Sequence, residues 1–152
     1  MAIRKATVQD IEQISLLFIE QFNIQAAWNP YLMQSGTQNK QFIEDTITNA
    51  EFDIFVAEES GKIVGFISIF EKTSPDFNFM VPHKYAYLMD IIITKEHRGK
   101  GLAAKLMNEI KQWALDRKLD HIELSVFANN SAVDFYIKCG YEETGKTMIC
   151  KL

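Results

Sequence analysis

Two glycines on either side of one lysine form the part of the sequence best suited to hold an anion. The run Arg98-Gly99-Lys100-Gly101 falls between a strongly apolar segment and a long amphipathic one. Glycines let the backbone turn tightly, and the free N–H groups and positive dipole at a helix start attract negative charge. The spacing predicts a pyrophosphate cradle with Arg98 and Lys100 as added charge, although a lone Gly-x-Gly more often marks a plain turn.

Two well-known nucleotide-binding patterns are excluded at this glycine run. No Gly-Lys-Ser or Gly-Lys-Thr ends it, so it is not a P-loop. The third glycine of the dinucleotide fingerprint is missing, and the run is not part of an N-terminal strand-helix-strand unit. The basic residues around it still suit a small anionic ligand.

A second candidate segment runs from Asn129 to Tyr141. Its asparagines and Ser131 suit the start of a short helix, and Gly140 suits the left-handed residue that ends one. Tyr136 lies within this helix and carries a phenol that can donate a proton. A half-buried ring with a wet hydroxyl is the structural alternative for the same residue.

Hydrophobic spacing predicts the elements that position these two segments. Apolar residues three or four apart indicate helices, whereas alternating or continuous apolar runs between turn residues indicate strands. The expected strands cover residues 3–6, 52–57, 63–70, 85–94 and 121–127, with a final strand or hairpin over 141–152. The first expected helix follows a start at residues 7–10 and fades before Asn29, and the others cover residues 38–49, 102–117 and 131–138. This alternation predicts one α/β domain spanning residues 1–152.

Three expectations concern individual side chains. Thr7 is expected to accept backbone N–H bonds at the start of the first helix, with Asp10 favouring its positive end. The second helix is expected to turn Phe42, Ile43 and Ile47 inward. Cys139 and Cys150 match no metal-ligand spacing and are expected to be reduced and packed inside.

Composition and charge limit the classes of function. The chain has 152 residues, 47% of them hydrophobic and 24% charged, as in ordinary globular domains. No run approaches the roughly 18 apolar residues of a membrane span, and the N-terminal residues lack a secretory pattern, so the cytoplasm is the expected location. A net charge of −4 disfavours nucleic acid as a partner. Residues 1–90 carry 12 acids and 6 bases, whereas residues 91–152 carry 8 acids and 10 bases.

Taken together, the two candidate segments resemble the GNAT acetyltransferase superfamily. Its Arg/Gln-x-x-Gly-x-Gly/Ala cradle is matched by Arg98 to Ala103, and its later Asn-x-x-Ala-x-x-x-Tyr-x-x-x-Gly-aromatic pattern is matched by Asn129 to Tyr141. Two motifs in the right order and spacing are far more specific than either alone. The order of expected elements extends the resemblance over essentially the whole chain, and most weakly over residues 23–37 and 73–84.

The resemblance implies the GNAT acyl-CoA N-acyltransferase fold. In that fold a central, mixed but mostly antiparallel sheet is flanked by helices and splays open between the strands 85–94 and 121–127, where CoA is inserted. It also implies acetyl-CoA as co-substrate and no metal. Asn130 is an open alternative to Asn129. The residues it assigns to acetyl-CoA are Ile91, Ile92, Ile93, Arg98, Gly99, Lys100, Gly101, Leu102, Ala103, Ala104, Asn129 and Tyr136.

The implied reaction is attack of a neutral amine on a thioester carbonyl. Tyr136 occupies the position of the family's general acid, which protonates the leaving thiolate. A general base is also needed, because an alkylamine with a pKa of about 10 is mostly protonated at neutral pH. Many members have a glutamate where this chain has Met89, which leaves Asp90 and Glu123 as candidates; each is also compatible with a structural carboxylate.

The sequence indicates only the general class of the acceptor substrate and leaves the oligomeric state open. We expect a primary amine on a small molecule or a peptide, with extra positive charge, because the loop over 73–84 and the N-terminal segments belong to the acidic part. A non-catalytic acyl-CoA-binding regulatory module and a toxin-type member that acetylates charged tRNA are the alternatives. A homodimer is left open, and neither nucleic acid nor a membrane is an expected partner.

Overall fold

The structure is a computed structural model that describes all residues from Met1 to Leu152. Two short 3-10 turns cover Val8–Asp10 and Lys95–His97. The strands are β1 (Ala2–Lys5), β2 (Phe52–Glu59), β3 (Lys62–Thr73), β4 (Lys84–Ile93) and β5 (Ile122–Leu124). The helices are α1 (Ile11–Trp28), α2 (Lys40–Thr48), α3 (Leu102–Asp116) and α4 (Val133–Lys138).

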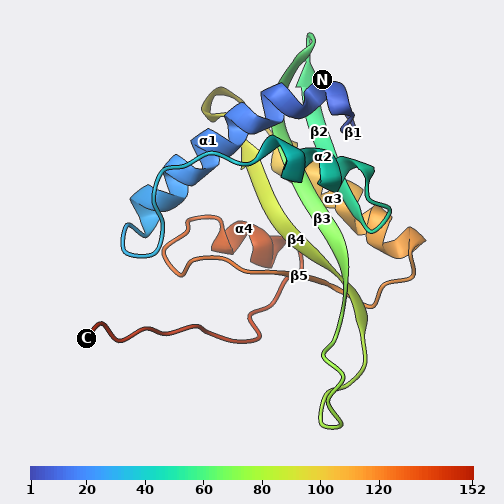
Figure 1. Ribbon diagram of the computed structural model, residues 1–152, viewed down its shortest axis with the longest axis vertical. Helices are drawn as coiled ribbons and strands as arrows, with labels where there is room; N and C mark the ends of the chain where they lie inside the picture. The colour runs from blue at the N-terminus through green and yellow to red at the C-terminus, as the bar shows by residue number, and fades with distance from the viewer.

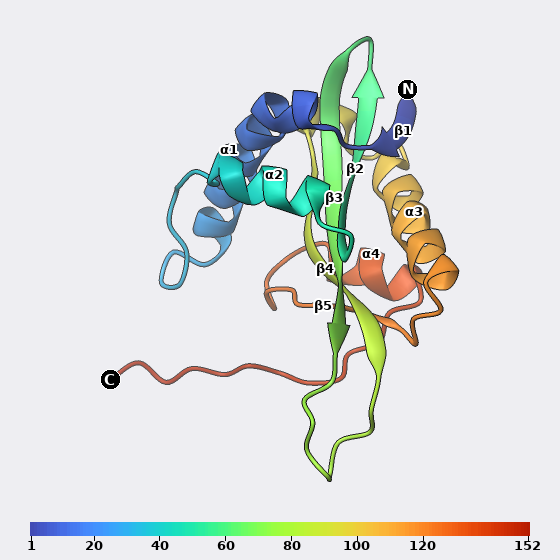
Figure 2. The same cartoon turned by 45° about the vertical axis from the view of Figure 1, so that its right-hand side comes forward.

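The five strands form one open sheet in the order β1-β2-β3-β4-β5. Neighbouring strands are antiparallel except for β4 and β5, which run parallel. Helices α1 and α2 cover one face of the sheet and α3 covers the other, on the same side as α4 (Figures 1 and 2). This is the mixed, mostly antiparallel α/β fold that the sequence predicts.

Each face of the sheet has its own apolar core. Ile14, Phe18 and Ile43 from α1 and α2 pack with strand residues such as Phe66 and Ile92 on one face. On the other face the expected α3 stripe packs against the strands together with Tyr136 of α4; this stripe is Leu102, Leu106, Ile110, Trp113 and Ala114. Strands β2 to β4 are covered on both faces, which explains their nearly continuous apolar sequence.

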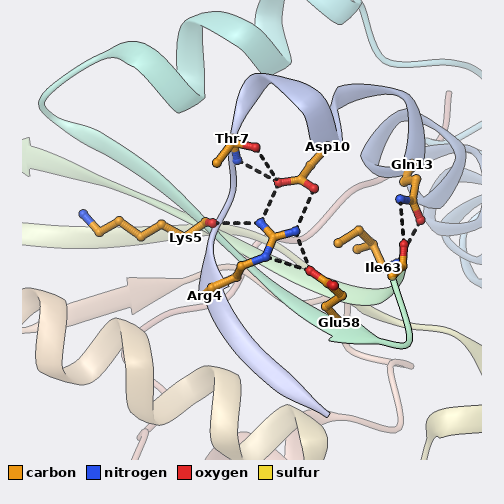
Figure 3. Close-up of polar contacts among 8 residues, drawn as sticks. Arg4, Lys5, Thr7, Asp10, Gln13, Glu58 and Ile63 are labelled. Carbon is orange, nitrogen blue, oxygen red and sulfur yellow. Dashed lines mark hydrogen bonds and ion pairs between the residues drawn. The ribbon is translucent and has the colours of Figure 1, made fainter.

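An ion network fastens the start of α1 to the sheet (Figure 3). The Arg4 guanidinium donates to both carboxylate oxygens of Asp10, at 2.7 and 2.9 Å, and to Glu58 of β2 at 2.8 Å. The Thr7 N–H also donates to Asp10, at 2.8 Å. The expected capping arrangement is therefore present, and the Thr7 hydroxyl adds a further hydrogen bond to the Asp10 carboxylate at 3.2 Å.

Several local expectations are wrong. Strand β5 ends at Leu124, and residues 141–152 form neither a strand nor a hairpin but extend away from the body (Figures 1 and 2). Phe42 is exposed, because the buried side of α2 consists of Ile43 and of Thr46 and the partly buried Ile47, which lie three and four residues after Ile43. Cys139 and Cys150 are free thiols, but Cys150 is exposed because it lies in the extended C-terminal segment.

Candidate active site

An opening in the sheet defines the centre of the candidate site. β5 pairs with β4 over three positions only, from Ala86 opposite Ile122 to Leu88 opposite Leu124. Beyond Leu88 this edge of β4 has no strand partner, although β3 continues to pair with the other edge as far as Ile93. The backbone groups of β4 that face the opening are free to pair with an extended ligand.

A β-bulge at the start of the opening changes the direction of the side chains. Ser68 of β3 pairs with Asp90 and Ile69 pairs with Leu88, so Met89 is an extra residue in β4. As a result, Leu88 and Ile91 both contact the core on the α3 side, although they lie three residues apart. Simple alternation along the strand would not place Leu88 and Ile91 on the same face.

The bulge turns the Asp90 carboxyl toward α1. The Gln21 side-chain amide of α1 donates to one carboxyl oxygen at 2.8 Å, and the Ser68 hydroxyl donates to the other at 3.0 Å. Burial raises the pKa of Asp90, while these two hydrogen bonds oppose the shift. No cation contacts the carboxyl, so a proton on Asp90 is favoured more than in water.

Gln21 is the site residue that sequence reasoning missed. Its side chain is 6% exposed, and its amide oxygen is buried without a hydrogen-bond partner. The signal was present in the sequence as a polar residue at an inward position of α1, three residues after Phe18 and four after Leu17. Buried polar atoms without partners are rare, so this oxygen requires an explanation.

Glu123 does not join the Asp90 cluster. It lies in β5 beside Tyr87, and its exposed side chain approaches His121 at 3.8 Å. The neighbouring contact across this pair of strands is a hydrogen bond of 2.9 Å from the Tyr87 hydroxyl to Ser125. Neither bond connects Glu123 to Asp90, and the two candidate bases therefore have separate surroundings.

The glycine run forms the turn expected before α3. Gly99 and Gly101 have positive φ angles of 74° and 76°, and a Cβ added to either would meet nothing within 4 Å. The first backbone bond at this helix end runs from the Lys105 N–H to the Gly101 carbonyl. The N–H groups from Gly99 to Ala104 precede that bond and have no backbone acceptor, as required for binding an anion.

The two basic residues of the turn differ in their surroundings. Arg98 donates to the Ile93 carbonyl at 2.8 Å and to the Glu20 carboxylate of α1 at 2.9 Å, so its charge is partly compensated. Lys100 is exposed and forms no ion pair. Lys100 is therefore the freer of the two cations toward a ligand.

His97 connects the turn to the β2–β3 hairpin, a link that the sequence did not reveal. One ring nitrogen lies 2.8 Å from the Thr94 hydroxyl and the other 2.9 Å from the Glu59 carboxylate. The bond to His97 lowers the pKa of Glu59. These contacts hold the peptide that precedes the glycine turn in place.

Tyr136 reaches the core between α3 and the sheet from α4. Its ring is buried, and its hydroxyl makes no hydrogen bond within the chain. Burial raises the pKa of Tyr136, and it raises that of the neighbouring Tyr141 to about 12. A phenol with a raised pKa stays protonated at neutral pH, which is the state that a proton donor needs.

The two asparagines have different contacts. Asn129 donates from its side-chain amide to the Trp28 carbonyl at the end of α1. The Asn130 side-chain oxygen accepts the Ala132 N–H at 2.8 Å, which is a local cap before α4. Asn129 thus joins the loop after β5 to α1 across the opening, whereas Asn130 is occupied within its own loop.

Two further features concern metals and membranes. The His, Cys, Asp and Glu side chains form no group of three that could hold a metal ion. None of the helices combines the length and apolar character needed to cross a membrane.

The open mixed sheet, with α1 and α2 on one face and α3 on the other, defines an N-acetyltransferase fold. The profile of the Acetyltransferase (GNAT) family matches residues 11–141, and the chain belongs to this family. The resemblance drawn from the two motifs is therefore confirmed.

Proteins with similar sequences carry names that agree with this family. The uncharacterized N-acetyltransferase YhfO of Bacillus subtilis is 28% identical over 153 residues, which cover 99% of this chain and 96% of YhfO. Streptothricin acetyltransferase of Escherichia coli is 42% identical over 57 residues, or 37% of this chain and 33% of that protein. N-acetyltransferase 8F1 of Rattus norvegicus is 23% identical over 135 residues, which cover 88% of this chain and 59% of that protein. This chain thus spans about three fifths of the rat protein's length.

Solved structures share the fold. A variant of the BH1408 protein of Bacillus halodurans has a TM-score of 0.94 at 26% identity, and the match covers 100% of this chain and 99% of that one. The matched region therefore includes the extended C-terminal segment of this chain. The aminoglycoside N-acetyltransferase AAC(6')-Iy, solved in complex with CoA, has a TM-score of 0.72 at 16% identity over 99% of this chain and 98% of that one.

Proposed function

We propose that the protein transfers the acetyl group of acetyl-CoA to a primary amine of a small molecule or a peptide, and that residues 1–152 act as one unit. The observation that carries the proposal is the open edge of β4, which leads directly into the glycine turn at the start of α3. Free strand groups followed by unpaired N–H groups suit an extended ligand with an anionic part. Acetyl-CoA has this form, with an amide-containing arm and a pyrophosphate.

The chain's own groups would hold acetyl-CoA along this path. The backbone of Ile91, Ile92 and Ile93 would pair with the arm, as an added strand pairs with a sheet edge. The N–H groups from Gly99 to Ala104 would bind the pyrophosphate, with charge from Lys100. A backbone N–H of β4 at the opening would also stabilise negative charge on the carbonyl oxygen during attack.

Asp90 is the proposed base for the amine. Its pKa is raised by burial, and a carboxyl with a raised pKa takes up a proton more readily than an exposed one. Its two partners, Gln21 and Ser68, are neutral donors that fix its orientation without a fixed cation. Glu123 remains the alternative, and its exposed carboxylate would act through solvent.

Tyr136 is the proposed acid on the opposite side of the opening. Its hydroxyl has no partner in the chain, so it is available to a sulfur atom placed in the gap. Its raised pKa keeps the proton on the hydroxyl oxygen until the thiolate leaves. The proton then moves from the phenol to the thiolate, and solvent reprotonates the resulting phenolate.

The acceptor is proposed to carry positive charge in addition to the reacting amine. The loop over 74–83, in the acidic part of the chain, leads into the first residue of β4. The glycine turn, in the basic part, follows the last residue of β4, so the two parts lie at opposite ends of one strand. Opposite fields at the two ends would separate an anionic co-substrate from a cationic amine. The names of the streptothricin and aminoglycoside enzymes are consistent with this class of acceptor.

The test is a turnover assay with acetyl-CoA across amines, aminoglycosides, amino acids and peptide N-termini. Tyr136→Phe should lower turnover by about 10²-fold, the usual scale for one general acid, and keep the rise in melting temperature caused by CoA. Tyr141→Phe is the matched control, since Tyr141 is a neighbouring, partly buried tyrosine whose ring lies 6.1 Å away. Its turnover should be unchanged.

Three results would contradict the proposal. Full turnover in Tyr136→Phe would leave Tyr136 as a packing residue. Binding of CoA without turnover of any amine would favour the regulatory module instead. Gly101→Asp should abolish the CoA-induced shift, because Gly101 has a φ of 76° and the new side chain adds negative charge at the cradle; a shift that persists would place the anion elsewhere.

A further inference from the structure

One buried amide oxygen beside Asp90 has no hydrogen-bond partner. This oxygen is Oε1 of Gln21, whose amide nitrogen donates to Asp90 Oδ1 at 2.8 Å. Gln21 is 6% exposed and is the only residue in the chain with a buried side-chain polar atom left unpaired. A buried acceptor without a partner is costly, so the arrangement favours a second state in which a donor faces this oxygen.

A second glutamine of α1 shows that the helix itself does not impose a free oxygen. The amide of Gln13 uses both of its ends (Figure 3). Its oxygen accepts the Ile63 N–H at 2.8 Å, and its nitrogen donates to the Gly61 carbonyl at 3.4 Å. Position on α1 therefore does not explain the free oxygen of Gln21, and the explanation lies with the neighbouring Asp90.

The carboxyl of Asp90 faces two neutral side chains. They are the Gln21 amide from α1 and the Ser68 hydroxyl from β3, which donates to Oδ2 at 3.0 Å. The carboxylate of Glu20 pairs with Arg98 instead, and the charged residues of α2 are exposed. No charged group contributes to the pKa of Asp90. The protonation of this carboxyl therefore depends on how its two neutral partners can respond.

The carboxyl needs different partners before and after it takes up a proton. A carboxylate only accepts hydrogen bonds, and Gln21 and Ser68 supply two donors. A protonated carboxyl has an O–H group that needs an acceptor. The Ser68 hydroxyl has one hydrogen, which it already directs at Asp90, and it makes no other side-chain hydrogen bond. Accepting the acid's O–H would leave that hydrogen without an acceptor, whereas Gln21 Oε1 accepts it at no such cost.

We propose that Gln21 is a positioning residue that pairs with Asp90 in both of its protonation states. The amide nitrogen holds the carboxylate, and the amide oxygen accepts the O–H of the acid. The exchange needs only rotation about the last torsion of the glutamine or of the aspartate, and both torsions are broad. The free oxygen in this structure is then the acceptor that the second state uses.

This inference rests on the proposed role of Asp90 as the general base. When an N–H bond of the protonated amine breaks, the electron pair stays on nitrogen and the proton forms an O–H bond on Asp90. Gln21 then turns its oxygen to that O–H and holds the acid in place while the neutral amine attacks the thioester. Solvent removes the proton after the product leaves.

The first experiment follows both side chains by NMR over the pH range in which circular dichroism shows an intact fold. The Cγ signal of Asp90 and the Cδ signal of Gln21 are identified by their absence in Asp90→Asn and Gln21→Met. Both signals should titrate with one midpoint, and Cδ should move downfield on protonation, as for a carbonyl that gains a hydrogen bond. The Cδ signal of Gln13 is the internal control and should stay in place, because its oxygen already has a partner.

Two substitutions of Gln21 test the pairing by their effect on the Asp90 midpoint. Gln21→Met removes both polar atoms, and the midpoint should rise by about one pH unit, because the hydrogen bond to the charged form is the stronger of the two. Gln21→Glu places a second carboxyl beside Asp90, so the two share one proton and the upper midpoint should rise further. Ser15→Ala removes a buried hydroxyl of α1 that donates to the Glu12 carbonyl, and should leave the midpoint unchanged.

Three results would overturn the pairing: a Gln21 Cδ signal that stays fixed while Asp90 titrates, an Asp90 that does not titrate in the folded protein, or an unchanged midpoint in Gln21→Met. None of these measurements needs turnover. A fixed Cδ signal together with loss of turnover in Asp90→Asn refutes the pairing alone. Joint titration together with full turnover in Asp90→Asn supports the pairing and refutes the role of Asp90 as base.

Discussion

Asp10 and Asp90 are two carboxyl groups on the same side of the sheet, and their surroundings shift their pKa values in opposite directions. Asp10 faces the Arg4 guanidinium and the Thr7 N–H, which hold its pKa below the ordinary value (Figure 3). Asp90 faces only the Gln21 amide and the Ser68 hydroxyl, and burial raises its pKa. Asp10 is buried and Asp90 is partly buried, and the main difference between them is that only Asp10 contacts a cation.

The difference separates a structural carboxylate, Asp10, from Asp90, the carboxyl that we propose as the general base. With Arg4 bound to both of its oxygens, Asp10 stays charged and joins β1 to the start of α1. With neutral donors only, Asp90 can exist with or without its proton near the opening in the sheet. The unpaired amide oxygen of Gln21 adds a further free acceptor beside Asp90, but none is left over at Asp10.

Replacing Asp90 by asparagine should have the largest effect, and mainly on turnover. Asp90→Asn removes the proposed base, so turnover should fall by at least about 10²-fold, while CoA binding is retained and the protein stays folded. The matched control is Glu123→Gln, which changes the exposed alternative and should leave turnover within a few-fold. If the control loses more turnover than Asp90→Asn, the roles of the two carboxyls are reversed.

Replacing Asp10 by alanine should act on stability instead. The substitution leaves Arg4 without its main partner in a partly buried network and should lower the free energy of unfolding by about 3 kcal/mol. Glu12→Ala, which removes the exposed partner of Lys40, is the control and should change it by less than about 1 kcal/mol. Denaturant unfolding measures both. Turnover of the folded Asp10→Ala protein should match that of the parent, and a large loss would remove the distinction.

The third and smallest expected effect is on the pH dependence of stability. As the pH rises, the two carboxyls should change the free energy of unfolding in opposite directions. For Asp10 the folded pKa lies below 3.8, so its stabilisation is present above that pH and is lost as the pH falls through the folded pKa. For Asp90 the folded pKa lies above 3.8, so its protonated form favours folding and the benefit is lost as the pH rises through that pKa.

Unfolding curves at a series of pH values test these signs. Relative to the parent, Asp10→Ala should lose least at acidic pH, where the network is already weakened. Asp90→Asn should gain stability relative to the parent as the pH rises above 3.8. Two variants with parallel pH profiles would show that the surroundings of these carboxyls do not differ in the proposed way.

Much of the fold was predictable because its signals are local. The helix ending before Asn29, the α3 stripe from Leu102 to Ala114 and the apolar run of β4 all match their expected positions closely. The misplaced features depend on which edges pair. The spacing over residues 141–152 predicts a strand, but it does not say that no edge of the same chain receives it.

The candidate site divides in the same way. By itself the sequence determined the family motifs, the glycine turn and the presence of Tyr136, because residue type and spacing along one segment are enough for these. Only the tertiary structure decided the contact of Gln21 with Asp90, which lie 69 residues apart, and the bulge at Met89 that aims the carboxyl. The pKa of Asp90 follows from the burial and neighbours that this packing creates, and no local pattern in the chain records them.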